Sequence, residues 1–328
     1  MSMNRTSIEW TELTWNPLRG CSHVSRGCEH CYAERMARRF VHAGFATEKG
    51  WTGRVELIES KLDGPLHRKK PSVIFVNSMS DTFHEKVPDE WLDRMFAVMA
   101  LCPQHRFLVL TKRAKRMREY FGGDQPLNRV PKCFEVFMRQ QHMGAAAWPG
   151  WPLPNVGLGV SVEDDSQLHR IEDLLPTPAA CRMVSLEPLL GPVDLPRDWL
   201  MNRCPECGTY LRRGWTDCPE PDCDGRPSGG IDWVIVGGES GPGARPMPPE
   251  WPRAIREQCV SAGVPFFFKG WGAWASTFNN DTSHGAMPKY QDVPVGDGTH
   301  HRMFRVGKKA AGRLLDGRLW DQMPEGWG

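Results

Sequence analysis

Short apolar runs alternate with amphipathic stretches along the chain. Each apolar run is nearly continuous and ends in small or polar residues. The runs occupy Ser72–Ser78, Arg106–Lys112, Asn155–Glu163, Cys181–Leu190, Asp232–Ser240 and Val264–Gly272. This pattern is typical of strands that are buried on both faces, as in a parallel sheet. A further strand is expected at Thr14–Gly20.

The stretches between these runs place their apolar residues at helical spacing. One of them, Pro88–Ala100, begins with a proline and acidic residues, which favour a helix N-terminus. The predicted helices occupy Tyr32–Val41, Pro88–Ala100, Ser166–Leu175 and Pro249–Val260. The basic segment at 307–324 has leucines and a tryptophan at near-helical spacing, so we expect a closing helix there.

Alternation of strands and helices predicts an α/β fold, a partial or full barrel of parallel strands joined by right-handed crossovers. A doubly wound open sheet is the alternative. We expect a single domain over residues 1–328 with a small insertion at residues 201–230. In both folds the functional site lies at the carboxyl ends of the strands. The polar residues at those ends, candidates for cofactor and substrate contacts, are Asn77, Ser78, Asp81, Ser161, Glu163, Glu187, Glu239 and Lys269.

The formal net charge of the chain is only +2, which excludes a strong electrostatic field over the whole protein. No apolar run approaches the roughly eighteen residues of a membrane span, and the N-terminus lacks a signal-peptide core. We therefore expect a cytoplasmic protein with no membrane partner. A local basic segment, Thr111–Phe121, suits phosphate contacts, with a solvated helix as the alternative.

Seven of the eleven cysteines fall into two clusters. Clustered thiols without a secretory signal indicate metal ligands rather than disulfides. Within the insertion, the spacing Cys204-x2-Cys207-x10-Cys218-x4-Cys223 predicts a closed four-thiolate site for a structural zinc ion. A redox disulfide or an iron–sulfur cluster is the alternative there.

The first cluster supplies only three thiols, Cys21-x6-Cys28-x2-Cys31. They lie on a loop between the expected first strand and the first helix. Three thiolates favour a [4Fe–4S] cluster with one iron left without a protein ligand, and such an iron can bind a substrate or cofactor. Zinc is the alternative, with His23 or His30 completing the site.

This arrangement resembles radical S-adenosylmethionine (SAM) enzymes, whose α/β barrel carries Cys-x3-Cys-x2-Cys after its first strand. "CEHCY" matches the second half of that motif, with Tyr32 as the aromatic residue beside the last cysteine, whereas the first spacer is six residues long. The resemblance implies a [4Fe–4S] cluster that cleaves SAM to a 5′-deoxyadenosyl radical for C–H activation. It also implies an external electron donor, and places Tyr32 at the SAM site.

Longer segments resemble a three-cysteine-motif family of bacteriophages and prophages. They include "SIEWTELTWNPLRGCSHVSRGCEHCYAERMA", "VNSMSDTFHEKVPDEWLDRMFAVM" and "DWVIVGGESGPGARPM", in that order. The resemblance implies a mobile-element origin and a host cytoplasm, but supplies no reaction. We therefore expect a radical-SAM-like enzyme of unknown substrate, with a nucleotide or nucleic-acid base as the candidate. The alternative is a non-catalytic, zinc-dependent nucleic-acid-binding protein.

Overall fold

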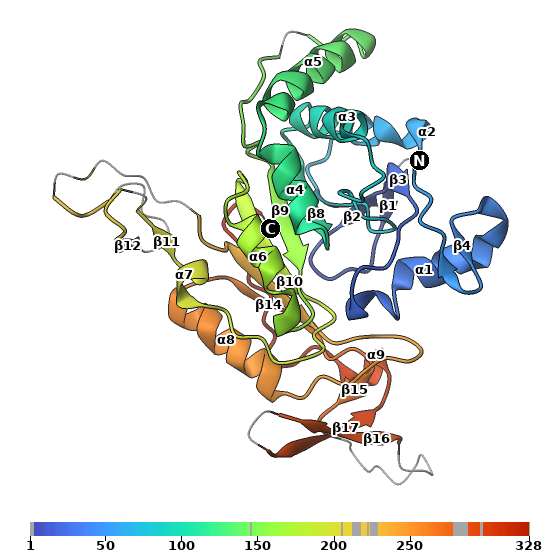
Figure 1. Cartoon of the computed structure of the whole chain (residues 1–328), viewed down its shortest axis with the longest axis vertical. Coiled ribbons are helices and arrows are strands. Elements are labelled where there is room, and N and C mark those ends of the chain that lie inside the picture. Colours follow the sequence, from blue (N-terminus) through green and yellow to red (C-terminus); the bar gives the residue numbers. More distant parts are fainter. Residues whose placement is uncertain are drawn as a thin grey trace. The chain divides into compact units, whose positions relative to one another are not determined.

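The structure is a computed structural model. It describes the chain apart from residues 1–2, 145, 205, 212–217, 222, 224–228, 278–287, 296–297 and 328, and apart from the side chains of 124, 125, 203 and 211. The fold is mixed α/β and contains a mostly parallel eight-stranded sheet with the order β1-β2-β7-β8-β9-β10-β13-β14 (Figure 1). This confirms the predicted α/β class; closure into a barrel stays a prediction.

The chain divides into two compact units. The first consists of Met1–Val160, Arg170–Met183 and Gly326–Gly328, and the second of Ser161–His169 and Val184–Glu325. The expectation of one domain with an insertion at 201–230 stays a prediction, and part of that insertion lies outside the described residues.

The first unit contains the parallel strands next to which the candidate site lies. β2, β7, β8 and β9 pair in parallel in that order, and β1 pairs antiparallel to β2. Many side chains of these strands are fully buried, as is typical of parallel sheets that are covered on both faces. These strands are β1 (Met3–Arg5), β2 (Leu13–Trp15), β7 (Val73–Val76), β8 (Arg106–Thr111) and β9 (Val156–Ser161), whose last residue belongs to the second unit.

Helices of the first unit bury the apolar stripes that the sequence predicts. In α3 (Asp89–Ala100), Leu92, Met95 and Phe96 are fully buried, and α5 packs along this helix (Figure 1). The other helices are α1 (Tyr32–Ala37), α2 (Glu59–Leu62), α4 (Ala114–Phe121), α5 (Asp124–Gln140), most of α6 (His169–Leu174), η1 (Arg26–Cys28), η2 (Arg38–Ala43) and η3 (Gly64–His67). The short strand pairs are β3 (Leu18–Arg19) with β6 (Glu56–Leu57), and β4 (Ala46–Thr47) with β5 (Gly50–Trp51).

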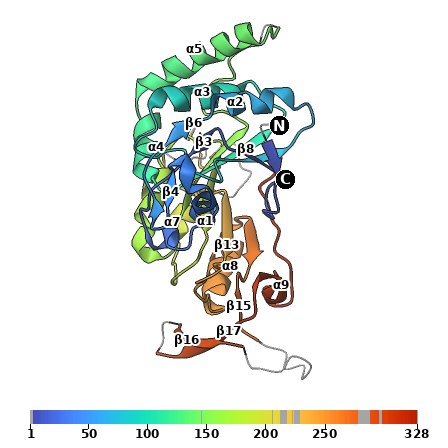
Figure 2. The same ribbon diagram turned by 90° about the vertical axis from the view of Figure 1, so that its right-hand side faces the viewer.

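In the second unit, β13 and β14 pair in parallel, and a separate antiparallel sheet has the order β15-β17-β16 (Figure 2). The strands are β10 (Cys181–Leu186, shared with the first unit), β11 (Asn202–Arg203), β12 (Tyr210–Leu211), β13 (Trp233–Gly237), β14 (Phe266–Gly270), β15 (Trp274–Ala275), β16 (Tyr290–Pro294) and β17 (His300–Arg305). The helices are η4 (Asp165–Gln167), α7 (Arg197–Leu200), α8 (Glu250–Ala262) and α9 (Lys308–Ala311).

The secondary-structure predictions are confirmed for the six apolar runs, each of which contains a strand. The expected first strand at Thr14–Gly20 is instead split into β2 and β3. The expected helix at Tyr32–Val41 ends as α1 and continues as η2, where Phe40 leaves helical geometry with φ −127°. No described helix is long and apolar enough to cross a membrane.

The prediction of a closing helix at 307–324 is wrong beyond α9. Gly312 ends α9 with φ +72°, in the left-handed region. The chain then runs extended beside β14, and the Phe268 amide donates to the Trp320 carbonyl at 2.8 Å. β14 is the last strand in the sheet order, and pairing with the tail satisfies backbone groups that an edge strand would otherwise leave free.

Candidate functional site

The three thiols of the first cluster lie on the loop between β3 and α1. Gly20 forms a parallel bridge with Ser80, which continues the pairing of β2 with β7. Cys21, the next residue, therefore lies directly after the carboxyl edge of the parallel strands. Cys28 is buried, whereas Cys21 and Cys31 are half-buried.

These thiols influence one another electrostatically. The pKa of Cys21 is raised to about 12, first by burial and then by the charge of Asp81; Arg113 opposes this increase, and the charge of Cys31 adds to it. Burial also raises the pKa of Cys31, the amides at the start of α1 lower it, and the charge of Cys28 raises it. Cys31 is therefore within electrostatic range of both other thiols, and burial disfavours the thiolate forms of Cys21 and Cys31.

The three sulfurs do not converge as ligands of one ion would. Among the described residues, the group whose ligand atoms all lie within 4.8 Å of one another is the second cluster, and the first cluster is not part of any such group. Thiolates that bind different irons of a cluster lie farther apart than thiolates that share one zinc ion. Among the described residues, the sulfurs of the second cluster therefore have the spacing of a single-ion site, and those of the first cluster do not.

The two histidines of the loop differ in their surroundings. His23 contacts the buried Glu34 through Nε2, and Arg38 contacts the other oxygen of Glu34. Both ring nitrogens of His30 are buried without a hydrogen-bond partner in the part of the chain that the structure describes. A buried unpartnered polar group costs about 1–3 kcal/mol, so the surroundings of His30 fit a group bound beside the loop.

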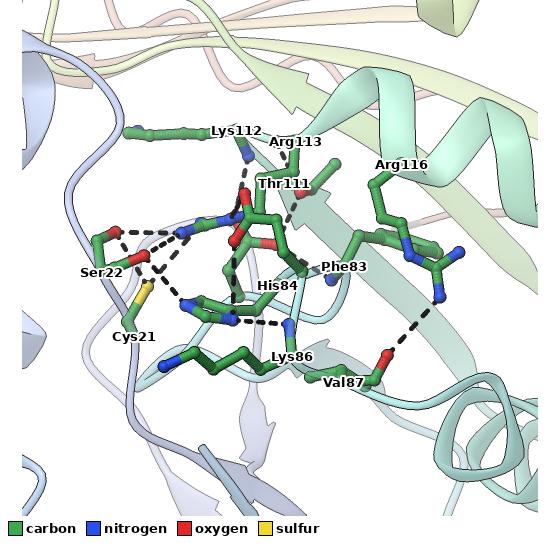
Figure 3. A network of polar contacts seen from close by, with 12 residues as sticks. Cys21, Ser22, Phe83, His84, Lys86, Val87, Thr111, Lys112, Arg113 and Arg116 are labelled. Atoms are coloured by element: carbon green, nitrogen blue, oxygen red, sulfur yellow. Dashed lines mark hydrogen bonds and ion pairs between the residues drawn. The ribbon is translucent and has the colours of Figure 1, made fainter. Parts of the chain in front are cut away.

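Arg113 connects the cysteine loop to the ends of two neighbouring strands (Figure 3). It follows β8, and its Nη1 lies 3.0 Å from Oδ2 of Asp81, which follows β7. The same Nη1 is 3.8 Å from the Cys21 sulfur, and Nη2 donates to Ser22 Oγ at 2.8 Å. Thr111 donates to the other Asp81 oxygen at 2.6 Å, so both oxygens of this buried carboxylate are engaged.

His84 completes the network (Figure 3). Its Nδ1 accepts a hydrogen bond from the Lys86 amide at 3.1 Å, so we assign the ring proton to Nε2, which lies 2.9 Å from Ser22 Oγ. Burial, and then the charge of Arg113, lowers the pKa of His84 and keeps the ring neutral. In this tautomer His84 donates to Ser22 and cannot take its proton, so the pair lacks the arrangement of a serine nucleophile and its base.

The predicted site residues of the first unit occupy this edge, but several are engaged by the protein itself. Asn77 is buried, accepts from the Leu18 amide at 3.1 Å and donates to Thr82 at 2.9 Å. Ser78 donates to Asn16 at 3.1 Å. Tyr32 differs, because its side chain is exposed next to Cys31. Roles of these residues in cofactor binding stay predictions.

The second unit holds the remaining strand-end candidates. Lys269, at the end of β14, contacts Glu187, which follows β10, and both are half-buried. Glu239 is buried and accepts two hydrogen bonds from the Arg245 side chain, at 2.9 and 2.7 Å, and one from its amide at 2.9 Å. Arg245 thus organises the loop after β13 around Glu239. The remaining two candidates, Ser161 and Glu163, are buried at the end of β9.

The second cysteine cluster has the geometry of a single-ion site. The Cys204 and Cys223 sulfurs are 3.5 Å apart, as are those of Cys207 and Cys218. A tetrahedral site with Zn–S bonds of about 2.3 Å separates its sulfurs by roughly 3.8 Å. Hydrogen bonds with the hydroxyl and backbone of Thr209, and then with the neighbouring thiols, lower the pKa of Cys207 to about 6. The cluster is compatible with binding of zinc or another metal ion.

The basic segment around α4 is largely neutralised by carboxylates. Arg116 contacts Asp89, Arg118 lies 3.0 Å from Asp173, and Lys115 lies 3.9 Å from Glu119. Because Arg113 is buried against Asp81, this helix offers little free positive charge for a phosphate backbone. The predicted polyanion surface therefore gains no support from these contacts. The arginines at 212 and 213 lie outside the described residues.

Sequence reasoning did not single out Ser22, Glu34, His84 or Arg113 as site residues. Arg113 follows the end of β8 by two residues and His84 follows the end of β7 by eight, and these two strands are neighbours. A polar residue shortly after a buried strand is thus the available signal. It is a weak one, because many such residues are solvated.

Comparison with known proteins identifies a family. No curated protein and no solved structure matches the chain. A protein-family profile with the description "Protein of unknown function (DUF5131)" matches residues 5–324. The match includes both cysteine clusters and the strands that carry the polar edge residues. The chain therefore belongs to this family of proteins of unknown function, DUF5131.

Proposed function

We propose that the protein is an iron–sulfur enzyme of the radical-SAM type. One observation carries the proposal: the loop that holds three thiols begins at the carboxyl edge of parallel strands, where Gly20 bridges Ser80. Active sites of parallel α/β proteins lie at this edge. On this proposal the parallel strands belong to a partial or full barrel.

The residues of the loop fit a [4Fe–4S] cluster. Cys21, Cys28 and Cys31 would hold three irons, and the fourth would be left for SAM. Burial raises the pKa of Cys21 and of Cys31, and the positive charges of Arg113 and Lys112, respectively, partly oppose this increase. The orphaned ring of His30 fits a bound group at the same place.

When bound and reduced, the cluster would supply the electron that cleaves SAM. The protein would position and shield the reactants. Tyr32, exposed next to Cys31, offers an aromatic face to the adenine ring. Burial of Cys28 and partial burial of the other two thiols limits the access of water.

The remaining parts of the proposal rest on resemblance and on the second cluster. The resemblance to the three-cysteine-motif family of phages and prophages supports a mobile-element origin, a nucleotide or nucleic-acid base as substrate, and an external electron donor. The four converging sulfurs of the second cluster support a zinc ion with a structural role.

The test is anaerobic purification and reconstitution of the full chain with iron and sulfide. We expect a brown protein with about four irons and four sulfides per chain. With dithionite as reductant, it should cleave SAM slowly to 5′-deoxyadenosine. The Cys28→Ala variant should lose iron and SAM cleavage, whereas the matched variant Cys133→Ser, half-buried in α5, should retain both.

Two results would contradict the proposal in different ways. A colourless protein that binds zinc at the first cluster excludes the iron–sulfur enzyme. An intact cluster that neither cleaves SAM nor changes its electron paramagnetic resonance signal with SAM leaves an electron carrier or a structural cluster.

A further inference from the structure

We propose that the buried pair Arg113 and Asp81 sets the reduction potential of the cluster held by Cys21, Cys28 and Cys31, acting as positioning and tuning groups. This inference rests on the proposed function. It adds residues outside the cysteine motif to the site and assigns each a direction of effect.

The geometry places a buried charge against the cluster loop. Arg113 is only 6% exposed and Asp81 only 7% exposed. Nη1 of Arg113 lies 3.0 Å from Asp81 Oδ2 and 3.8 Å from the sulfur of Cys21 on the loop. Buried charges are screened much less than surface charges, so both groups act on the loop at close range.

The remaining contacts hold Arg113 in one place. Its Nη2 donates to the carbonyl and hydroxyl oxygens of Ser22, at 3.1 and 2.8 Å, and its Nε donates to Glu85 at 2.8 Å. A guanidinium with five donors in a rigid fork can make all these bonds at once, whereas an ammonium cannot. Arg113 is therefore fixed against Cys21 and its neighbour.

Ser22 adds a hydrogen-bond donor beside the first thiol. Its Oγ accepts from Arg113 Nη2 and, with the ring proton assigned to Nε2, from His84. Both interactions use the oxygen as acceptor, so the hydroxyl proton of Ser22 is left to donate to another group. Hydrogen bonds to cluster sulfurs are among the factors that set a cluster potential.

The two charges should act in opposite directions. Reduction adds an electron to the cluster, so a nearby cation stabilises the reduced form and a nearby anion destabilises it. Arg113 therefore raises the potential, and Asp81 lowers it. Glu85 acts in the same direction as Asp81 but more weakly, because its side chain is 59% exposed to solvent.

The experiment is a potentiometric titration of the reconstituted full chain, followed by electron paramagnetic resonance of the reduced cluster. Arg113→Met should lower the midpoint potential by about 59 mV or more, which is a tenfold change in the one-electron equilibrium. Asp81→Asn should raise it. Glu85→Gln should raise it by less, and Arg113→Lys should stay closer to the wild type than Arg113→Met.

The opposite signs distinguish tuning from a structural role, because loosening the loop would not produce opposite shifts from two partners of one ion pair. Equal potentials, or shifts of the same sign in Arg113→Met and Asp81→Asn, overturn the inference. If these variants retain no cluster, Glu85→Gln decides: an upward shift supports the inference and no shift overturns it. A wild-type protein without a cluster contradicts the proposed function itself.

Discussion

The two cysteine clusters differ in what holds their thiols in place. At the first cluster, Gly20 bridges Ser80 beside the parallel strands, and Arg113 donates two hydrogen bonds to Ser22. At the second, the strands that the structure describes beside the thiols are β11 and β12, of two residues each, and one thiol, Cys204, is buried. An isolated two-stranded hairpin is at best marginally stable in water.

The comparison indicates whether the protein fold or a bound ion holds each cysteine segment in place. The first loop is attached to the sheet and to a buried ion pair, so its position does not depend on a bound group. In the described part of the second segment the paired strands have two residues each, so a bound ion would contribute to the folding free energy there. Three preorganised thiols suit a site that must leave one position open, and four converging thiols suit a closed one.

The largest effect is expected at the second cluster. The Cys204→Ser, Cys207→Ser double variant should lose all bound zinc, because two thiols cannot close the site, and β11 and β12 should lose their hydrogen-exchange protection. Metal analysis and hydrogen–deuterium exchange measure the two losses, with Cys133→Ser as the control. Unchanged zinc in the double variant would contradict the closed four-thiolate site.

Loss of one thiol from the first cluster should abolish iron binding as completely as the double substitution abolishes zinc binding. The structure should be disturbed less. Cys21→Ala, Cys28→Ala and Cys31→Ala should each abolish iron binding, while the far-ultraviolet circular dichroism spectrum stays close to that of the wild type. The physical reason is that strands, rather than iron, hold this loop. Full iron content in any one variant removes that residue from the ligand set; a collapsed spectrum shows that the loop depends on its metal.

A smaller effect is expected from Gly20→Ala in the metal-free protein. Gly20 has φ +88°, and a Cβ there would lie 1.9 Å from the Arg54 carbonyl oxygen, so the free energy of unfolding should fall by about 2 kcal/mol or more. Gly44→Ala is the matched control. Its φ is +75°, but the added Cβ meets only the flexible Arg54 guanidinium at 3.2 Å, and the cost should be about 1 kcal/mol.

Urea unfolding, followed by circular dichroism, measures both glycine variants. Equal losses would show that the close approach at Gly20 does not constrain the start of the cysteine loop. A larger loss for Gly20→Ala, together with weaker iron uptake, would connect the backbone at β3 to the metal site.

The smallest effect is expected from His23→Ala. Glu34 engages Nε2 of His23, and the side chain of His23 is 43% exposed, so we expect unchanged iron content and an unchanged cluster spectrum. With Nε2 engaged by Glu34, only Nδ1 of His23 could bind a metal. A histidine that contacts a carboxylate through one ring nitrogen and a metal through the other is a common arrangement, so the variant tests this possibility. Loss of iron in this variant would make His23 a fourth ligand, close the open position and leave SAM without an iron.

Much of the fold was predictable because its signals are local. The runs at β7, β8 and β13 are nearly continuous in apolar residues, as strands buried on both faces are. The tail was not predictable in this way. Its leucines and Trp320 have helical spacing, yet the edge of β14 offers backbone hydrogen bonds that outweigh this preference.

The candidate site shows the same division. The sequence alone determined the two sets of thiols, their number and their spacing, because ligand chemistry is written in residue types at short separations. Only the tertiary structure decided that Arg113 and Asp81 meet at Cys21, because that contact depends on β2, β7 and β8 lying next to one another. Strand order comes from long-range packing, and no local spacing specifies it.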